Sequence, residues 1–510
     1  MFIMIVLLSM FILLAYYYYV YYGRNGRLIN LIPGPLGVPI AGNAFQSYIS
    51  AEELWKLKCS VSDKYYPIFK IWIFFTYGVS IRHPDDLKTI LSSTKYTEKS
   101  QLYNFFLPWL GTGLFTSTGA KWHARRKILT SAFHSNVLNQ FANILLKEGD
   151  CMTKSLKHTG GVVVKDLIPF VSEHTLNAIC ETAMGISLQK LSESQQYRNA
   201  VHDIIELILY RGLRPWFYND FLFSLSPQGR KQKRILKILH GFTEKIIAER
   251  KLYHERTNDR YLKNLENDKE TETDDVKAFG IKKKRLAMLD LLIAASRDHF
   301  LTDLDIKEEV DTFMFGGHDT TAMSMTYALL LLAEHKDVQE RVRVEVDTVM
   351  QENGGKLTTR SLQNLSYLER CLKETLRLYP VVSYILRNME EDVKLHSYVV
   401  PAGTILHLDI FQVHRDPNFW PNPGVFDPDR FLPENIQNRH PYSYLPFSAG
   451  SRNCIGQRFG LLEMKAMIAS LVHNFYLEPI NYLKDIQLRF DLIIRPSHPV
   501  YVKFIPISRK

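Results

Sequence analysis

The segment from Phe447 to Gly456 surrounds one cysteine with residues suited to holding a metal. A cysteine that ligates a metal through its thiolate needs backbone N–H groups directed at the sulfur, a nearby cation and no bulky side chain pressing on a flat cofactor. Gly450 and Gly456 allow close approach of the backbone, and Arg452 supplies positive charge. The alternative is a free cysteine packed in a glycine-rich turn. The spacing favours Cys454 as a thiolate ligand, at the positive end of a helix predicted from the apolar run that follows.

A second group of candidate residues lies in the helical pattern of Glu309–Ala322, which reads EVDTFMFGGHDTTA. Two adjacent glycines inside a helix cost about 1 kcal/mol each relative to alanine. Gly316 and Gly317 therefore need a structural reason, and we expect them to remove Cβ atoms that would strike a flat cofactor. Asp319 and Thr320 put an acid beside an alcohol, a pair suited to relaying protons. The alternative for Thr320 is a hydroxyl that only bonds back to a helical carbonyl.

Five positions of the cysteine segment resemble the haem-binding loop of the cytochrome P450 monooxygenases. They are Phe447, Gly450, Arg452, Cys454 and Gly456. The resemblance covers the chain from Ile32 to the C-terminus and implies haem b with an axial thiolate from Cys454. It implies the family's fold, a single large haem-enclosing domain that is mainly α with a smaller β region. The implied reaction inserts one oxygen atom of O2 into an apolar substrate, with Asp319 and Thr320 assisting protonation.

Glu374 and Arg377 stand three residues apart on one predicted helix face, where opposite charges can pair. Such pairs are usually exposed and contribute little to stability. Together with Arg430, however, they resemble the family's buried Glu-Arg-Arg triad, which implies a structural role in supporting the cysteine loop. Removing one charge is expected to cost about 3–5 kcal/mol, because the others would stay buried and unpaired.

The resemblance also implies cations at the edge of the haem, which carries two propionates. Trp122 and Arg126 stand four residues apart in a helical pattern and match the family's tryptophan-and-arginine contact. Arg387 and Arg452 match two further contacts. For any one of these arginines alone, a position on the solvated surface is the simpler interpretation. As a set on matching positions, they favour propionate binding.

The segment Val310–Thr321 resembles family 4 of the cytochromes P450, the branch associated with ω-hydroxylation of fatty acids and related lipids. Many members carry, at the position of Gly316, a glutamate that can form an ester to a haem methyl. The missing carboxylate predicts non-covalent haem and a selectivity relaxed from the terminal carbon toward in-chain positions. Hormones and foreign compounds are the alternative substrates. Family members usually have alanine where this chain has Gly460.

The resemblance implies electrons from NADPH through a separate membrane-bound flavoprotein reductase, with cytochrome b5 as a further donor. The chain contains no glycine-rich flavin or nicotinamide segment that would indicate a fused reductase. It also lacks zinc, phosphate-loop and nucleic-acid patterns, so no nucleic-acid partner is expected. Two other classes stay open: a haem-thiolate isomerase or dehydratase, which Asp319 and Thr320 disfavour, and a non-catalytic haem-bound lipid carrier or sensor.

The first 22 residues contain no charged residue. At about 1.5 Å per residue, a helix of this length just spans a hydrocarbon core of roughly 30 Å. Tyrosines at its end would form an interfacial belt, with Arg24 and Arg27 following on the cytosolic side. A cleavable signal peptide is the alternative, which the length of the stretch and the lack of a basic leader disfavour. We expect a transmembrane anchor in the endoplasmic reticulum, contact with membrane lipid and a catalytic domain facing the cytosol.

Three regions are predicted: the anchor over 1–22, a basic and Pro/Gly-rich hinge over 23–45, and one catalytic domain over 46–510. Strand-like runs such as Tyr65–Phe75 and Ser397–Val400 are few, and helical patterns predominate from Lys121 onward. These patterns cover 122–133, 137–156, 167–184, 197–209 and 234–250. The polar stretch His254–Lys284 predicts a solvated loop. The aromatic segment Arg214–Phe223 indicates either a channel lid at the bilayer surface or ordinary core packing.

The overall composition agrees with this organisation. Five scattered cysteines, an odd number, argue against a disulfide framework and for a reducing compartment. The net charge of +10 suits a protein that lies against anionic lipid or docks an acidic electron donor, although it also serves solubility.

Overall fold

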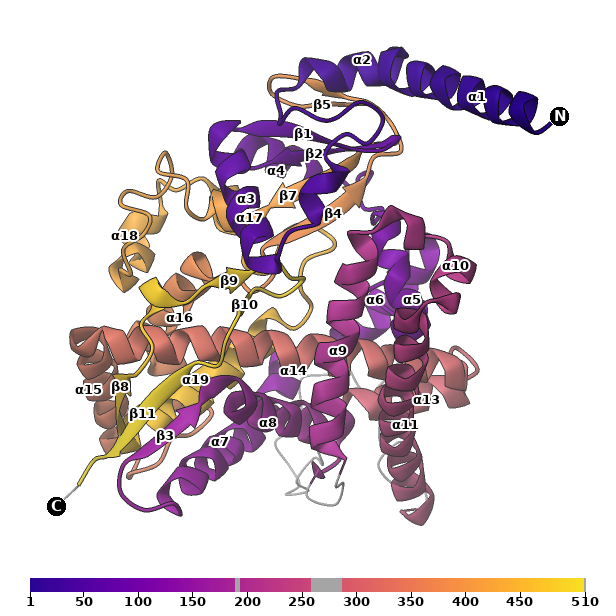
Figure 1. Ribbon diagram of the computed structural model, residues 1–510. Coiled ribbons are helices and arrows are strands. Elements are labelled where there is room, and N and C mark those ends of the chain that lie inside the picture. Colours follow the sequence, from indigo (N-terminus) through magenta and orange to yellow (C-terminus); the bar gives the residue numbers. More distant parts are fainter. Residues whose placement is uncertain (189–192, 258–286, 509–510) are drawn as a thin grey trace. The chain divides into compact units, whose positions relative to one another are not determined.

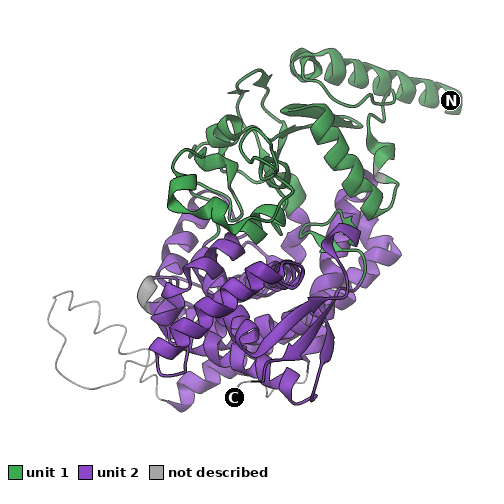
Figure 2. Cartoon of the chain, turned by 90° about the vertical axis from the view of Figure 1, so that its left-hand side faces the viewer, with its two compact units in different colours: residues 1–103, 374–454, 486–498 green, residues 104–373, 455–485, 499–510 purple. Residues whose placement is uncertain are grey.

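The computed structural model of this 510-residue chain describes residues 1–188, 193–257 and 287–508. Two compact units form, each from segments far apart in the sequence (Figure 2). Unit 1 consists of residues 1–103, 374–454 and 486–498, and unit 2 of residues 104–373, 455–485 and 499–510. The prediction of a mainly helical chain with a smaller β region is confirmed. Most of the predicted loop 254–284 lies outside the described residues, and its first residues, 254–256, belong to a helix.

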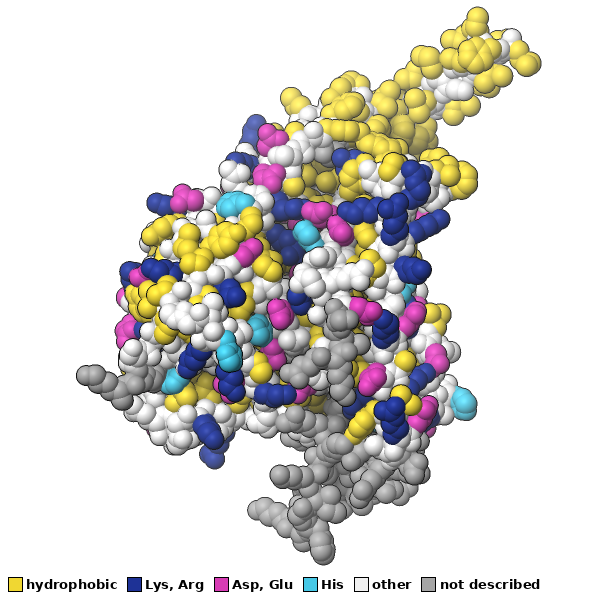
Figure 3. Space-filling view, turned by 60° about the horizontal axis from the view of Figure 1, so that its bottom comes forward, with side chains coloured by type: hydrophobic (Ala, Val, Ile, Leu, Met, Phe, Trp, Pro, Cys, Tyr) yellow, Lys and Arg dark blue, Asp and Glu magenta, His cyan; other side chains and the backbone are white. Residues whose placement is uncertain are grey.

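Helix α1 (Phe2–Tyr22) is long and apolar enough to cross a membrane, and none of its residues is buried. Figure 3 shows it as a nearly continuous hydrophobic surface. A second helix, α2 (Arg24–Leu31), follows directly and takes up the first part of the predicted hinge region 23–45. The reason is tertiary: Ile29 is buried in the core of unit 1, and Asn30 Nδ2 donates a hydrogen bond to the Tyr21 carbonyl at 3.1 Å. The Pro/Gly-rich stretch begins only after this helix.

The rest of unit 1 is built on a four-stranded sheet in the order β1 (Ile68–Ile73), β2 (Thr76–Ile81), β7 (Ile405–Asp409), β4 (Tyr384–Asn388). Strands β2 and β7 are parallel and the other neighbours are antiparallel. Helices α3 (Ala51–Lys64) and α4 (Pro84–Leu91) complete this unit's larger elements before residue 103. A capping box between Ser50 and Glu53 begins α3. The sheet thus joins strands from the two ends of the chain, and it carries Arg387 on β4.

Unit 2 surrounds the 32-residue helix α14 (Asp303–Glu334), which Thr302 and Asp305 cap through a capping box. Most residues of this helix from Ile306 to Ala333 are buried, as is typical of a helix inside a large core. Figure 1 shows it running along α8 (Leu167–Ile179) and α19 (Gln457–Asn474), against which it packs. The other long helices of this unit are α7 (Ser135–Lys157), α9 (Ser194–Gly212), α11 (Pro227–Arg256), α13 (Met288–Arg297) and α15 (Lys336–Glu352).

Shorter elements complete unit 2. Helices α5 (Leu107–Leu110), α6 (Gly119–Ser131) and α10 (Asp220–Leu225) precede α11, and an antiparallel sheet has the order β3 (Val163–Asp166), β11 (Tyr501–Pro506), β8 (Phe475–Pro479). Helix α16 (Ser366–Leu378) links the two units in sequence. Of the five predicted helical patterns, the first (122–133) runs past the end of α6 at Ser131, and in the third α8 ends at Ile179 and a π-helix continues to Met184.

Candidate functional site

The cysteine loop of unit 1 is closed by its own backbone. The Cys454 N–H donates to the Phe447 carbonyl at 2.9 Å, and the Asn453 N–H donates to the Gly450 carbonyl at 3.2 Å. Gly450 has a φ of +74°, and any Cβ there would lie 1.8 Å from the Leu91 carbonyl oxygen. Glycine is therefore required at this position, because both the backbone conformation and the space exclude a side chain. The loop leaves Cys454 exposed, as an external ligand would require.

Gly456 stands at the N-cap of α19, so this helix begins directly after the loop in the chain. The partial positive charge of a helix N-terminus favours an anion such as a thiolate. The position of α19 in the sequence agrees with the helix expected after the cysteine.

Glu374, Arg377 and Arg430 lie together in unit 1. Arg377 Nε and Nη2 donate to the two carboxylate oxygens of Glu374, each at 2.7 Å, and both side chains are fully buried. Arg430 Nε lies 3.3 Å from Glu374 Oε1. Arg377 also donates to three backbone carbonyls, those of His414, Pro423 and Val425. The pair thus organises a loop that sequence spacing alone did not connect with it.

Three cations gather in unit 1. Arg387 is buried on β4, and Lys99 forms an isolated β-bridge with it. Burial, with further contributions from Arg387 and Arg452, lowers the pKa of Lys99 well below its ordinary value. Cations held this close to one another favour a bound anion, and the two propionates of a haem meet that requirement. The residues present therefore fit a haem at this loop.

Lys99 was not among the residues predicted from the sequence. It lies in the polar stretch Ser92–Ser100, where no motif surrounds it. The bridge to Arg387, formed across almost three hundred positions of the chain, brings it to the other cations, and the Asn388 N–H donates to the Glu98 carbonyl at 3.0 Å beside it.

In unit 2, helix α6 carries Trp122, which is buried, and Arg126, which is half-buried. The neighbouring Arg125 is held by α14 instead: it donates to Glu309 at 3.0 Å and also pairs with Asp305. Burial raises the pKa of Glu309 to about 7, against the opposing effects of the Leu114 N–H and Arg125. Arg125 and Glu309, neither predicted from the sequence, fix α6 on α14 and leave Arg126 on a different side of its helix.

The two adjacent glycines of α14 have different surroundings. A Cβ on Gly317 would lie 2.6 Å from Ile179 Cδ1 of α8, whereas a Cβ on Gly316 would meet nothing within 4 Å. Gly317 therefore has a packing reason of its own, the close approach of α8, and the expectation that both glycines serve a cofactor stays a prediction. Gly316 is exposed, as few other residues of this helix are.

The acid and alcohol that follow these glycines also differ in exposure. Asp319 is buried, and Thr320 is half-buried one turn after Gly316. The Thr320 hydroxyl donates to the Gly316 carbonyl at 2.7 Å. This is the back-bond stated as the alternative for Thr320, and it leaves the oxygen free to accept a further hydrogen bond. His318 points elsewhere, with Nε2 3.1 Å from Ser172 Oγ of α8.

Aromatic rings crowd around Phe315, immediately before Gly316. The ring of Phe315 lies 4.9 Å from Trp109, 5.8 Å from Phe115 and 6.0 Å from Phe106. The segment between Trp109 and Phe115 is held close to α14, because Glu308 of α14 accepts hydrogen bonds from the backbone N–H and the hydroxyl of Thr112. The four rings form a mainly apolar group around Phe315, the residue before the exposed Gly316, and we name them the Phe315 cluster.

The contrast between the two glycines gives a first prediction. Gly317→Ala should lower the free energy of unfolding by about 1–3 kcal/mol, because the new methyl group overpacks against Ile179. Gly316→Ala should leave it unchanged or raise it by up to about 1 kcal/mol, because alanine favours the helix and the Cβ meets open space. Urea unfolding of the purified variants measures both. Equal stabilities of the two variants would contradict the packing reason for Gly317.

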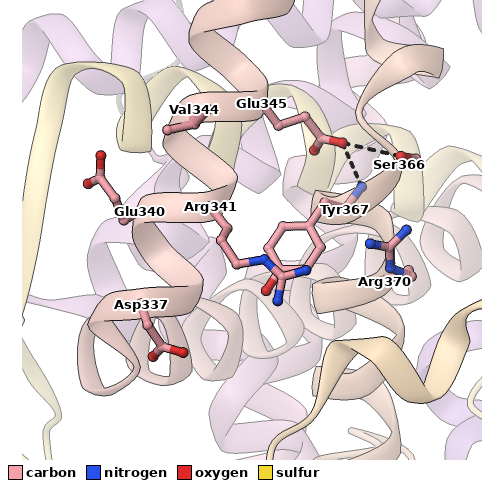
Figure 4. Close-up of a pocket in the computed structure, with 8 residues that line it drawn as sticks. All are labelled: Asp337, Glu340, Arg341, Val344, Glu345, Ser366, Tyr367 and Arg370. Carbon is pink, nitrogen blue, oxygen red and sulfur yellow. Dashed lines mark hydrogen bonds between the residues drawn. The ribbon is translucent and has the colours of Figure 1, made fainter.

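An open groove of about 630 Å³ lies between α15 and α16 of unit 2, apart from all the predicted site residues (Figure 4). Arg341 stacks on the Tyr367 ring at 4.0 Å from its centroid. Glu345 accepts hydrogen bonds from the Tyr367 N–H at 2.7 Å and the Leu368 N–H at 2.9 Å. Glu345 thereby caps the N-terminus of α16, the helix that carries Glu374 and Arg377. The groove results from this helix packing.

Comparisons with known proteins agree with the motifs. The cytochrome P450 family model matches residues 32–504. The chain is 38% identical over 502 residues to cytochrome P450 4c21 of Blattella germanica, covering 97% of this chain and 98% of that protein. It is 38% identical over 496 residues to cytochrome P450 4c3 of Drosophila melanogaster, covering 96% and 92%. It is 36% identical over 488 residues to cytochrome P450 4V2 of Homo sapiens, covering 94% and 91%.

Proposed function

The chain belongs to the cytochrome P450 family, with relatives in its family 4, and from this premise we propose that it hydroxylates the terminal or near-terminal carbon of fatty acids or related lipids. Family membership makes it a haem-thiolate monooxygenase that works with a redox partner reductase and an apolar substrate. The observation that carries the substrate proposal is the Phe315 cluster beside the exposed Gly316. Such a group of aromatic rings suits a hydrocarbon chain.

Residues of each unit are assigned to the haem in this proposal. In unit 1, Cys454 would ligate the iron, and Lys99, Arg387 and Arg452 would face the propionates. In unit 2, Trp122 and Arg126 would add a propionate contact. When bound, the haem supplies the activation of dioxygen that C–H hydroxylation requires.

The protein's own contribution to the reaction is the control of protons and water. The Thr320 hydroxyl donates its proton to the Gly316 carbonyl, one turn earlier in α14. By rotating, it can donate that proton instead to a group on the side of α14 where Gly316 is exposed. Asp319 precedes Thr320 in the sequence and is buried, and we assign to it the resupply of that proton. The Phe315 cluster keeps water away from the bordering space.

The proposal places the enzyme in the endoplasmic reticulum membrane, with the catalytic region in the cytosol. Helix α1 supports a membrane anchor. In unit 2, helix α10 exposes Phe221, Leu222 and Leu225, whereas Phe223 of the same helix is buried. The segment predicted as either lid or core thus has both kinds of side chain, and its exposed ones support contact with lipid. Electrons are proposed to come from NADPH through the reductase, with cytochrome b5 as a second donor.

Turnover of the purified protein with reductase and NADPH against long-chain lipids tests the function. Oxygen-dependent hydroxylation at or near the chain terminus is the expected result. Rearrangement of peroxides without NADPH would indicate an isomerase, and binding without turnover would indicate a carrier or sensor. The product distribution also tests the missing carboxylate at position 316, because a profile confined to the terminal carbon would contradict relaxed selectivity.

A second prediction concerns the attachment of the haem. Because Gly316 offers no carboxylate for an ester, all haem should leave the polypeptide during acidic organic extraction. Gly316→Glu is the matched variant, since its Cβ meets open space and its side chain restores the carboxylate. Part of the haem should then stay with the polypeptide, as followed by mass spectrometry. Retention of haem by the unaltered protein would overturn the prediction.

A further inference from the structure

A buried histidine connects the Glu374–Arg377 pair with the cysteine loop in unit 1. His414 follows the short helix α17 (Ile410–Val413) and is fully buried. Its backbone carbonyl accepts a hydrogen bond from Arg377 Nη1 at 3.0 Å. Its ring nitrogen Nε2 accepts a hydrogen bond from the Leu445 N–H at 2.6 Å. One residue thus contacts both the ion pair and the chain that leads into the loop.

The hydrogen bonds continue from Leu445 into the loop. The Leu445 carbonyl accepts from the Ser448 N–H at 3.0 Å, where Ser448 has a φ of +59°. The adjacent Phe447 carbonyl accepts the N–H of Cys454 at 2.9 Å. A non-glycine residue in this left-handed conformation persists only when its surroundings hold it. Leu445 is therefore the point at which the start of the loop is fixed.

We propose that His414 is a positioning residue for the thiolate loop, which it holds through the Leu445 N–H while its own ring stays neutral. The proposal rests on the haem-thiolate assignment of Cys454. A backbone N–H needs an acceptor, so Nε2 has to carry a lone pair and the proton belongs on Nδ1. Protonation of the ring removes the acceptor and breaks the connection between Arg377 and the loop.

The surroundings of the ring oppose its protonation. Burial, with the positive charges of Arg377 and Arg415, lowers the pKa of His414 to about 3. Tyr444 stacks on the ring, with centroids 5.3 Å apart. The carboxylate of Glu374 is already shared between Arg377 and Arg430. The backbone carbonyls of Arg377 and Leu376 favour the protonated ring, but burial and the two arginines outweigh them.

The sign of the pH effect follows from this lowered pKa. A loop that opens exposes His414, whose pKa then returns to about 6.5. Above that pH the ring is neutral in both states, and the contact contributes fully. As the pH falls below about 6.5, the open loop takes up a proton that the closed loop refuses, so opening becomes easier by up to about tenfold per pH unit.

The test compares two substitutions of His414 in the haem-loaded, full-length protein. His414→Gln keeps an acceptor that does not titrate, and His414→Leu removes the acceptor. One readout is amide hydrogen exchange at Leu445 and Ser448. The other is the rate at which the reduced carbonyl complex loses the absorption band of thiolate ligation between pH 7.5 and 5. For His414→Leu we expect exchange faster by about tenfold at neutral pH, as the loss of one buried hydrogen bond implies.

His407 provides the control, because it is a half-buried histidine of unit 1 whose pKa is also lowered, to about 4, mainly by desolvation. Its Nδ1 lies 3.0 Å from Ser80 Oγ, whereas the Leu445 N–H donates to His414. His407→Gln should keep the acid-dependent loss of the thiolate band, whereas His414→Gln should abolish most of it. The proposal is wrong if His414→Gln keeps the full pH dependence, or if His414→Leu leaves the exchange at Leu445 unchanged. If His414→Leu binds no haem, the acid-dependent loss of the thiolate band is compared between His414→Gln and the unaltered protein. A full loss in both would then refute the proposal.

The outcome is distinguishable from failure of the proposed function. Both readouts follow ligation and loop exchange and require no substrate. The protein could hydroxylate no lipid and still lose its thiolate band in acid only when His414 is present. That result would support the role of His414 and contradict the proposed function. A protein without any thiolate band would refute the assignment of Cys454 itself.

Discussion

Replacing Arg377 with methionine is expected to lower the free energy of unfolding by about 3–5 kcal/mol. The substitution leaves the fully buried carboxylate of Glu374 with Arg430 at 3.3 Å as its remaining ion-pair partner. It also removes the donor from three backbone carbonyls of the 414–425 segment, one of them that of His414. Chemical denaturation of the purified variant measures the loss, and the fraction of protein that carries haem should fall with it.

A surface pair of the same unit is the control for this prediction. Lys95 and Glu391 lie 3.3 Å apart, and their side chains are 71% and 51% exposed. Glu391→Gln should change the free energy of unfolding by less than about 1 kcal/mol, because water screens an exposed pair and solvates the remaining charge. If both substitutions lowered the free energy of unfolding by similar amounts, burial would not explain the contribution of the Glu374–Arg377 pair to stability.

Replacing Thr320 with alanine is expected to reduce hydroxylated product by about 100-fold. The hydroxyl that bonds to the Gly316 carbonyl is the proton donor assigned to the open side of α14, and alanine removes it. Electrons should still be consumed, so the yield of product per NADPH oxidised should fall and hydrogen peroxide should rise. Thr320→Ser keeps a hydroxyl and should restore most of the yield.

Thr326 allows a matched control on the same helix. Its hydroxyl makes the same kind of bond, to the Ala322 carbonyl at 2.8 Å, and the residue is fully buried. Thr326→Ala removes a comparable back-bond from α14 and should leave the yield of product per NADPH unchanged. An unchanged yield in Thr320→Ala would mean that its hydroxyl serves only the helix, as the back-bond alone suggests.

The two glycines of α14 illustrate how far a local pattern can be interpreted. The pattern indicated correctly that adjacent glycines in a helix need a reason. It assigned one reason to both, although the approach of Ile179 from α8 explains Gly317 by itself. Helix spacing determines which direction a residue faces, but it does not identify the neighbour that occupies that direction. Gly460 is similar, because a Cβ there would meet Thr321 Oγ1 at an ordinary 3.8 Å, so the alanine common in relatives would fit.

The cations show the same limit. Arg387 and Arg452 were predicted as haem contacts because each belongs to a motif that resembles the family. Lys99 belongs to no motif, and it reaches Arg387 through a bridge between distant segments. Arg125 and Arg126 are neighbours in sequence, yet α14 binds the first through Glu309 and leaves the second half-buried. The resemblance selected Arg126 by its spacing from Trp122, but it gave no role to Arg125.

The sequence by itself determined the features that depend on short spacings: the cysteine between Gly450 and Gly456, the pairing of Glu374 with Arg377, the apolar N-terminal helix and the family. These features are local, because a helix turn or a loop closed by its own backbone, as between Cys454 and Phe447, forms from neighbouring residues. Only the tertiary structure decided which distant groups support them: Leu91 against Gly450, Lys99 beside Arg387, and His414 between Arg377 and Leu445. Such contacts form when the core brings remote segments within hydrogen-bond distance, and the spacing of residues along a single chain does not encode that distance.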